Sequence, residues 1–461
     1  MWIDRSSYLI FYSDVLDKIL EKLGRTAQNE PSAHPFQRGK TMNLTTLDSR
    51  FSTITGLFLV FCLAGCQPGG EADLSDAPAA AQAGAVADPV STPESASEGL
   101  DPSVAMPSNS IPTFSTEHLA RKSSYYVGGD YVGDPPVMGG QMYVEVWEPH
   151  EITQPYPMVL FHGNGQTGVD WLQTPDGRAG WAYYLIEQGY VLYMVDYPAR
   201  GRSAYVPGGV HGDLGIRTAA QLQTIWTDVE EMGNFPLNDN HTQWPGEGRP
   251  GDPVFDDFIK TQVQFAGQST TLARYAAIEL LEQIGPVILF THSQGGGVGF
   301  GVTDGAPGLV KGLITVEPGG PQIGRVSTSQ VAYTGDPANA WGPVNYPLTY
   351  APAVSDPSEF KTYLEDEADQ PGEVPCWLQE EPARQLVNFA DVPVLSVSAD
   401  GTYHRVFDAC IPKWLNQAGV ETDFVRLEDV GLSGNGHMMM LELNSDDIIA
   451  FIHEWIQDNV E

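Results

Sequence analysis

The stretch Val287–Gly297 reads Val-Ile-Leu-Phe-Thr-His-Ser-Gln-Gly-Gly-Gly, and the fold can be worked out from it. An apolar run of strand length leads into a turn of small residues and then into a segment that can be helical. A serine at such a junction sits on a sharp turn, and small residues must flank it so that strand and helix can pass closely. Gly295 meets this requirement, whereas Thr291 stands where glycine is usual. The pattern predicts that Ser293 is a nucleophile.

Apolar strands and helical segments alternate on both sides of this stretch. Tyr125–Val132 and Gln141–Trp147 are rich in β-forming residues and separated by Gly and Pro, so they predict a hairpin. The further expected strands are Met158–Phe161, Val191–Val195, Val287–Thr291, Gly312–Val316, Val392–Val397 and Asp423–Leu427. The expected helices are Trp181–Gln188, Thr270–Gln283, Gly296–Thr303, Val406–Gln417 and Ser445–Gln457. Short apolar strands between helices predict an α/β fold, with a mostly parallel, doubly wound sheet covered on both faces.

Two long segments interrupt this alternation, at residues 203–265 and 319–390. Loops of this length in a compact domain usually form lids or binding loops. We interpret residues 319–390 as a cap over the active site and residues 203–265 as a contributor to it. The alternative is surface decoration without a role in the site.

A serine nucleophile needs a base, and His437 is the best candidate. It ends the Gly-rich segment Leu432–His437, after the last expected strand and before the last helix. His404 and His453 are alternatives, although His453 falls inside an expected helix. His292 adjoins the serine, and we expect it to pack rather than to react.

Two carboxylates compete to orient the histidine. Asp400 follows the strand Val392–Val397, and Glu317 follows the strand Gly312–Val316. Both lie between the serine and the histidine in the chain, so either satisfies the order serine, acid, histidine.

The negative charge that develops on an attacked carbonyl needs two backbone N–H donors. Gln294, directly after the serine, is one candidate. The other is Asn164, in the glycine-rich loop His162–Gly168 that follows an expected strand, because glycines let the backbone approach a substrate closely. The alternative interpretation of this loop is a simple tight turn.

Several blocks together resemble the α/β-hydrolase serine esterases, and more narrowly a small bacterial branch of them. The blocks are Phe161-His162-Gly163 with Thr167-Gly168, Thr174–Arg178 with Gly180-Trp181, Gly201-Arg202-Ser203, His292-Ser293-Gln294, Val316–Gly319 and Gly434–Met440. The resemblance spans residues 114–461 in the right order. It implies a carboxylic ester hydrolase that forms an acyl-enzyme and needs no cofactor or metal.

In that branch the acid is a Glu after the strand that follows the nucleophile helix, which corresponds to Glu317 and favours it over Asp400. The turn Asp196–Ser203 also resembles a turn common in the superfamily, in which Arg200 would bridge loops beneath the site. The chain departs from the branch at Asn164-Gly165, where known members carry adjacent cysteines. Alternatives on the same triad are a lactonase, a polyester depolymerase or an acyltransferase. A non-catalytic surface-binding lipoprotein is a further alternative.

The first part of the chain has the pattern of a targeting signal. The apolar run Ile54–Ala64 is too short to span a membrane but suits a signal peptide. It leads into Leu63-Ala64-Gly65-Cys66, which resembles the lipobox of bacterial lipoproteins. We therefore expect a signal peptide at 42–65 and a lipid on Cys66. A flexible acidic linker would follow at 66–113, ahead of the domain at 114–461. Residues 1–41 would be an extension from a mis-assigned start, and Gln67 after the cysteine resembles the pattern for the outer membrane of the bacterial envelope.

The net charge and the cysteines limit the partners. The chain has 23 basic and 59 acidic residues and a formal charge of −36, which argues against nucleic acid as a partner. Its four cysteines form no zinc-binding pattern. If Cys62 is removed with the signal and Cys66 carries lipid, then Cys376 and Cys410 remain, and in an oxidising compartment we expect them to form a disulfide.

Overall fold

The computed structural model describes residues 112–461. The expectations for residues 1–41, for the signal peptide at 42–65 and for Cys66 lie outside the described residues, as does nearly all of the linker at 66–113. Between residues 112 and 461, no helix has the length and apolar character needed to cross a membrane.

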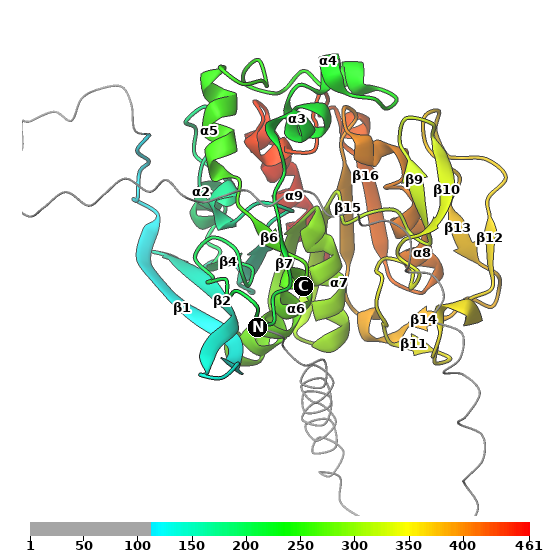
Figure 1. The fold of residues 1–461 in the computed structure, drawn as a ribbon, viewed down its shortest axis with the longest axis horizontal. Coiled ribbons are helices and arrows are strands. Elements are labelled where there is room, and N and C mark those ends of the chain that lie inside the picture. Colours follow the sequence, from blue (N-terminus) through cyan, green and yellow to red (C-terminus); the bar gives the residue numbers. More distant parts are fainter. Residues whose placement is uncertain (1–111) are drawn as a thin grey trace, which may run out of the picture. The chain divides into compact units, whose positions relative to one another are not determined.

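A single eight-stranded sheet forms the centre of this domain (Figure 1). The opening hairpin β1–β2 is antiparallel and joins β4 antiparallel, and all the other neighbours are parallel. In sheet order the strands are β1 (Leu119–Val132), β2 (Val137–Pro149), β4 (Leu192–Asp196), β3 (Met158–Phe161), β7 (Val287–His292), β8 (Val310–Val316), β15 (Val394–Ser398) and β16 (Thr422–Arg426). The expected α/β fold is confirmed, and each parallel strand begins and ends within two residues of its expected bounds.

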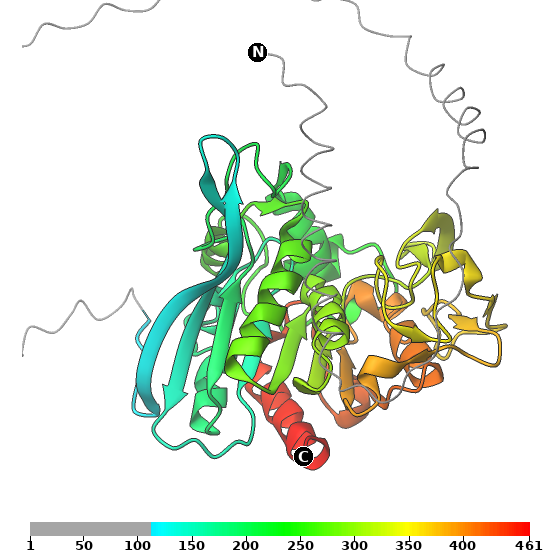
Figure 2. The same ribbon diagram turned by 90° about the horizontal axis from the view of Figure 1, so that it is seen from below.

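The strand pleat divides the interior into two hydrophobic cores, one on each face of the sheet. In β3, Val159 and Phe161 belong to the core shared with α6, α7 and α8, whereas Met158 and Leu160 belong to the core shared with α2 and α9. This alternation follows from the period of two along a strand. The helices are α2 (Trp181–Glu187), α6 (Ser269–Ile284), α7 (Gln294–Gly305), α8 (Cys410–Gln417) and α9 (Ser445–Asn459). Figure 2 shows α6 and α7 over one side of the sheet and α9 beneath the other.

The first insertion, residues 203–265, is more regular than its composition suggests. It holds β5 (Leu214–Gly215), α3 (Ala219–Leu222), the π-helical turn Gln223–Thr227, α4 (Val229–Met232) and α5 (Pro253–Thr261), and it ends at β6 (Phe265–Ala266), which pairs with β5. Its apolar residues Leu222, Trp226 and Phe258 are buried in the core of α2 and α9. The burial of these side chains stabilises the segment.

The second insertion, residues 319–390, folds into three small two-stranded sheets beside α8 (Figure 1). Its strands are β9 (Gly324–Ser327), β10 (Ala332–Pro337), β11 (Tyr350–Ala351), β12 (Thr362–Leu364), β13 (Trp377–Gln379) and β14 (Gln385–Leu386). Phe360 packs edge-on against Trp414 of α8, with ring centroids 5.4 Å apart, and the Trp414 indole donates to the Tyr350 hydroxyl at 3.0 Å.

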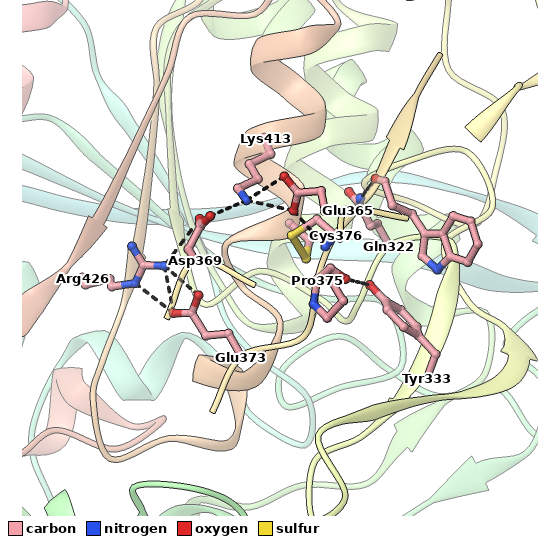
Figure 3. The surroundings of a disulfide bond; sticks show 11 residues. Gln322, Tyr333, Glu365, Asp369, Glu373, Pro375, Cys376, Lys413 and Arg426 are labelled. Atoms are coloured by element: carbon pink, nitrogen blue, oxygen red, sulfur yellow. Dashed lines mark hydrogen bonds and ion pairs between the residues drawn. A yellow bond between two sulfur atoms is a disulfide. The ribbon is translucent and has the colours of Figure 1, made fainter. Parts of the chain in front are cut away.

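A disulfide and an ion-pair cluster join this insertion to α8 (Figure 3). Cys376 is bonded to Cys410, the first residue of α8, which is the pair expected from the sequence. One helical turn later, the Lys413 ammonium lies 2.9 Å from Glu365 and 2.6 Å from Asp369. The insertion is therefore fastened to the same helix by covalent, ionic and apolar contacts.

Candidate active site

Ser293 lies at the turn between β7 and α7 in a strained backbone conformation. Its φ is 52° and its ψ is −120°, a region that residues other than glycine rarely adopt. The turn is held by hydrogen bonds on both sides of the residue. The Ser293 N–H donates to the Val316 carbonyl at 2.9 Å, and its carbonyl accepts from Gly296 at 2.9 Å and Gly319 at 2.7 Å. The surrounding fold thus stabilises the strained serine.

The close packing of β7 and α7 explains both the glycine and the threonine that flank Ser293. A Cβ at Gly295 would lie 2.8 Å from the Phe161 carbonyl, so that position requires glycine. At Thr291 the side chain is accommodated because α7 has Gly299 opposite it, where a Cβ would lie 2.7 Å from the threonine methyl. The Thr291 hydroxyl donates to the Ile314 carbonyl at 3.0 Å. The departure from the usual glycine is therefore compensated on the helix.

His437 and Glu317 meet at the carboxyl ends of the parallel strands. His437 Nδ1 lies 2.6 Å from Glu317 Oε2, and both side chains are fully buried. The carboxylate also accepts from the Thr402 hydroxyl at 2.9 Å and from the Ala399 N–H at 3.0 Å. Glu317 itself has a positive φ of 45°. These contacts fix the imidazole with its other nitrogen, Nε2, turned away from the carboxylate.

The other candidate residues have different partners. Asp400 accepts from the Gly434 N–H at 2.8 Å, so it holds the loop that carries His437 and is not the carboxylate on its Nδ1. His453, inside α9, lies 3.1 Å from the Tyr190 hydroxyl. It belongs to the packing of α9, as expected for a histidine within a helix.

Aromatic rings enclose the His437 imidazole. His404 stacks on it with centroids 4.6 Å apart and planes 14° apart, and Trp226 of the first insertion stacks on it at 5.7 Å and 23°. The His292 ring lies 4.6 Å away, and its Nε2 is 3.0 Å from the His437 carbonyl. His292 is therefore a packing residue, as expected, but it packs on the loop that carries His437, Leu432–His437, which is called the histidine loop below. His404 is paired with Asp408, whose carboxylate lies 2.8 Å from Nδ1.

The cluster of Glu317, His404 and His437 does not suit a metal ion. Potential ligand atoms of these side chains lie within 4.8 Å of one another. The two imidazole planes are nearly parallel, however, so their in-plane lone pairs cannot converge on one ion. The closest contact in the cluster is already made by the carboxylate and His437 Nδ1.

Burial determines the charge of the imidazole. It lowers the pKa of His437 well below its ordinary value, and nearby His292, His404 and Arg217 lower this pKa further. The ring is therefore neutral near pH 7 and can accept a proton at Nε2. Among residues 112–461, Nε2 has no hydrogen-bond partner, including the Ser293 hydroxyl. Catalytic hydrogen bonds are often long before substrate binds.

Opposing effects act on the pKa of the Glu317 carboxyl group. Burial raises the pKa of Glu317 above its ordinary value and the charge of Asp408 raises it further, whereas the donors Ala399 and Thr402 lower it.

The loop after β3 presents free backbone donors. Within the described chain, neither the Asn164 N–H nor the Gln294 N–H donates to a protein acceptor. Arg200 joins the two segments, because its guanidinium donates to the Gly163 carbonyl at 2.9 Å and to the Gln294 side chain. This buried arginine thus bridges two loops of the site, as expected from the sequence.

The first insertion is hydrogen-bonded to the histidine loop. The N–H groups of Thr242 and Gln243 donate to the Gly434 carbonyl at 2.9 and 3.0 Å. The buried His241 lies 2.8 Å from the Glu442 carboxylate, which also accepts from the backbone of the histidine loop. The sequence predicts a cap from residues 319–390 with residues 203–265 as a contributor. Of the two insertions, the first contacts His437 and its loop through Trp226 and His241, whereas Gly319 of the second donates to the Ser293 carbonyl.

Several contacts of the site could not be read from the sequence. Trp226, Arg217, the His404–Asp408 pair and the His241–Glu442 pair belong to no local motif. The last pair joins residues 201 positions apart. Within the first insertion, the two large aromatic side chains Trp226 and Trp244 are the local sign of a structured role.

The strand order, the strained serine at the turn after β7 and the buried histidine–carboxylate pair define an α/β-hydrolase. No family model matches the chain. It is 38% identical over 342 residues to "Probable secreted lipase phiG" from Fungal sp. (strain ATCC 74256), across 73% of this chain and 89% of that protein. It also resembles the solved structure of "a Novel Bacterial Esterase", with a TM-score of 0.51 and 20% identity over 77% of this chain and 100% of that one. The chain therefore belongs to the family of this lipase within the α/β-hydrolases, and it is a carboxylic ester hydrolase.

Proposed function

We propose that the protein is a serine esterase in which Ser293 is the nucleophile, His437 the general base and Glu317 the acid that orients the base. The observation that carries this proposal is the 2.6 Å contact between His437 Nδ1 and Glu317, with Nε2 of the same ring unpaired. A carboxylate on Nδ1 holds the proton there, so Nε2 can take the proton from the serine.

The reaction proceeds through an acyl-enzyme. The Ser293 oxygen bonds to the ester carbonyl carbon while its proton passes to His437 Nε2, and the N–H groups of Asn164 and Gln294 bind the oxyanion. The ester C–O bond then breaks, and the imidazolium protonates the leaving alcohol. Water repeats the sequence on the acyl-enzyme, which releases the acid and restores the serine.

Loss of the nucleophile is the first test. Ser293→Ala should lower kcat by roughly 10⁴- to 10⁶-fold, with an unchanged circular dichroism spectrum, and should abolish labelling by a fluorophosphonate probe. A wild-type protein that the probe does not label would favour the non-catalytic alternative.

A pair of variants tests the acid. Glu317→Gln should lower kcat by roughly 10³- to 10⁴-fold, because the neutral amide no longer favours the required tautomer of His437. Asp400→Asn should cost far less, since Asp400 accepts from the Gly434 N–H and is not the carboxylate on His437 Nδ1. The opposite ranking would transfer the role to Asp400.

A substrate panel separates the related activities. Chromogenic esters, lactones and polyester films should be compared, together with an added alcohol that would accept the acyl group in place of water. Preferred hydrolysis of simple esters supports the proposal. Dominant lactone opening, film degradation or alcohol acylation would assign one of the alternatives on the same triad.

We also propose that the protein is exported and anchored through lipid on Cys66 in a bacterial envelope. The support is the apolar run Ile54–Ala64 followed by Leu63-Ala64-Gly65-Cys66, together with the name of the relative, which describes a secreted protein. Labelled palmitate should enter the wild type and Cys62→Ala but not Cys66→Ala. Incorporation into Cys66→Ala would contradict the anchor.

A further inference from the structure

Arg217 is a cation without a carboxylate partner beside the candidate oxyanion donors. Its Nε donates to the Asn164 side chain at 2.8 Å, and the backbone of Asn164 is one of the two proposed donors. Within residues 112–461 it makes no ion pair, its side chain is partly exposed, and its terminal nitrogens are not among the buried unpaired atoms. They are therefore accessible and can donate to a ligand.

The chain holds this arginine in place from both sides. Before it, β5 pairs with β6, and after it a capping box at Thr218 and Gln221 starts α3. The guanidinium lies over the Trp226 ring, with its central carbon 5.3 Å from the centroid, and the same tryptophan stacks on His437. Arg217 is thus connected to the base through one aromatic ring and to the oxyanion loop through one hydrogen bond.

The electrostatic setting makes this arginine unusual. The protein carries a formal charge of −36, and Arg202 and Arg249 of this region are paired with Asp196 and Glu247. Arg200 has no carboxylate partner either, but it is buried and its guanidinium donates to the Gly163 carbonyl and the Gln294 side chain. A guanidinium presents several donors in a planar fork that matches a carboxylate. A negatively charged surface would repel an anionic substrate, so a local cation at the site would be needed to bind one.

We propose that Arg217 binds a carboxylate of the substrate, so that the enzyme prefers esters carrying a carboxylate close to the scissile carbonyl, such as half-esters of short dicarboxylic acids. This inference rests on the proposed function, because it names the substrate class of the same site. Arg217 is in this view a specificity residue whose contribution depends on the charge of the substrate.

The test compares matched esters with and without the charge. Monoethyl succinate and ethyl butyrate have four-carbon acyl chains, and release of ethanol is measured for both. A second pair, O-butyryl glycolate and propyl butyrate, moves the carboxylate to the alcohol side and is assayed by release of butyrate. Wild type should favour the charged member of at least one pair by roughly 10-fold or more in kcat/KM, mainly through a lower KM.

Variants of Arg217 then separate binding of the substrate from support of the loop. Arg217→Gln should remove the preference for the charged ester, so that kcat/KM falls roughly 10-fold more for the charged ester than for the neutral one. Arg217→Lys should retain part of the preference, because it keeps the charge but not the fork. Arg249→Gln is the matched control, since Arg249 is an exposed, paired arginine of the same insertion, and it should behave as wild type.

Three results would overturn the inference. Equal rates for charged and neutral esters in wild type would exclude a carboxylate preference. An equal fall of kcat for both esters in Arg217→Gln would show that the arginine only supports the Asn164 loop. Hydrolysis of neither ester by wild type would count against the proposed function itself, and with it against this inference.

Discussion

The two insertions are fastened to different parts of the domain. Residues 203–265 are bound to the loop of His437, through the N–H groups of Thr242 and Gln243, the His241–Glu442 pair and the stacked Trp226. Residues 319–390 are bound to α8 through the Cys376–Cys410 disulfide, the Lys413 ion pairs and packing on Trp414. They are also hydrogen-bonded to Asp304 near the end of α7, through Thr349 and Asn388.

The difference indicates separate roles for the two segments. A segment that contacts the base and its loop controls the orientation of the imidazole, which affects turnover. A segment that packs into the core beside α7 and α8, away from His437, contributes mainly to the free energy of unfolding. Changes in the first insertion should therefore appear in kcat, and changes in the second in stability.

The largest effect on stability is expected from the disulfide. Replacing both Cys376 and Cys410 by Ser opens a cross-link over 34 residues and should lower the free energy of unfolding by about 3–4 kcal/mol. Thermal unfolding should show the loss as a lower Tm, and kcat at 25 °C should stay within about twofold. Reducing agent should lower the Tm of the wild type but not of the double variant. A fall of kcat at 25 °C in the folded double variant would break the proposed division of roles.

The contacts between the first insertion and the histidine loop should affect kcat. His241→Ala leaves the buried Glu442 carboxylate without its imidazole partner and loosens the loop, so we expect kcat to fall by roughly 10- to 100-fold with little change in KM. The exposed neighbour Asn240 provides the control, because Asn240→Ala should leave kcat unchanged. A normal kcat in folded His241→Ala would show that the first insertion merely covers the site.

The pH dependence sharpens the same comparison, because buried neutral histidines surround the site. Burial lowers the pKa of His162 and of His292 to about 3. The unfolded chain takes up these protons near pH 6.5 and the folded chain does not, so stability is lost as the pH falls from about 6.5 toward 3. At pH 5.5 the loss relative to pH 7.5 should be about 3 kcal/mol from the two residues together. Urea unfolding at pH 7.5 and 5.5 measures it, and His292→Asn should reduce the difference.

The same burial shifts the activity profile. Because the pKa of His437 is lowered well below its ordinary value, the acidic limb of kcat/KM should lie below pH 6.5. A midpoint at or above pH 6.5 would contradict a buried, neutral base.

The smallest effect is expected from the ion pairs of the second insertion. Lys413 and its partners Glu365 and Asp369 are partly exposed, so Lys413→Met should lower the free energy of unfolding by about 1 kcal/mol or less. High salt should weaken the ion pairs of the wild type, so the difference in free energy of unfolding between wild type and Lys413→Met should become smaller. The kcat of the variant should equal that of the wild type. If Lys413→Met lowered the free energy of unfolding by more than the double Cys variant does, the ion pairs would stabilise the second insertion more than the disulfide, contrary to this prediction.

The local parts of the site were predictable because the signals that define them are local. The apolar strands, the glycine-rich turns and the candidates Ser293 and His437 follow from residues within a few positions of each other. Even the unusual Thr291 could be recognised as a departure, although its compensation by Gly299 became apparent only when β7 and α7 were seen packed. The sequence predicts residues 203–265 as a contributor to the site without saying how, because a segment rich in Pro, Gly and Asn gives no sign of what its buried Trp226 contacts.

By itself, the sequence of this protein determined the α/β order of elements, the position of the serine on its turn and the histidine loop, since hydrophobic period and turn chemistry act over short distances. The tertiary structure decided which carboxylate lies on His437, that Arg217 stands beside Asn164 and which insertion grips the histidine loop. Glu317 follows β8 and Asp400 follows the neighbouring strand β15, and the packed structure has the first of them on the imidazole. Contacts of this kind join residues tens to hundreds of positions apart, and they are set by how the strands are ordered and how the insertions pack.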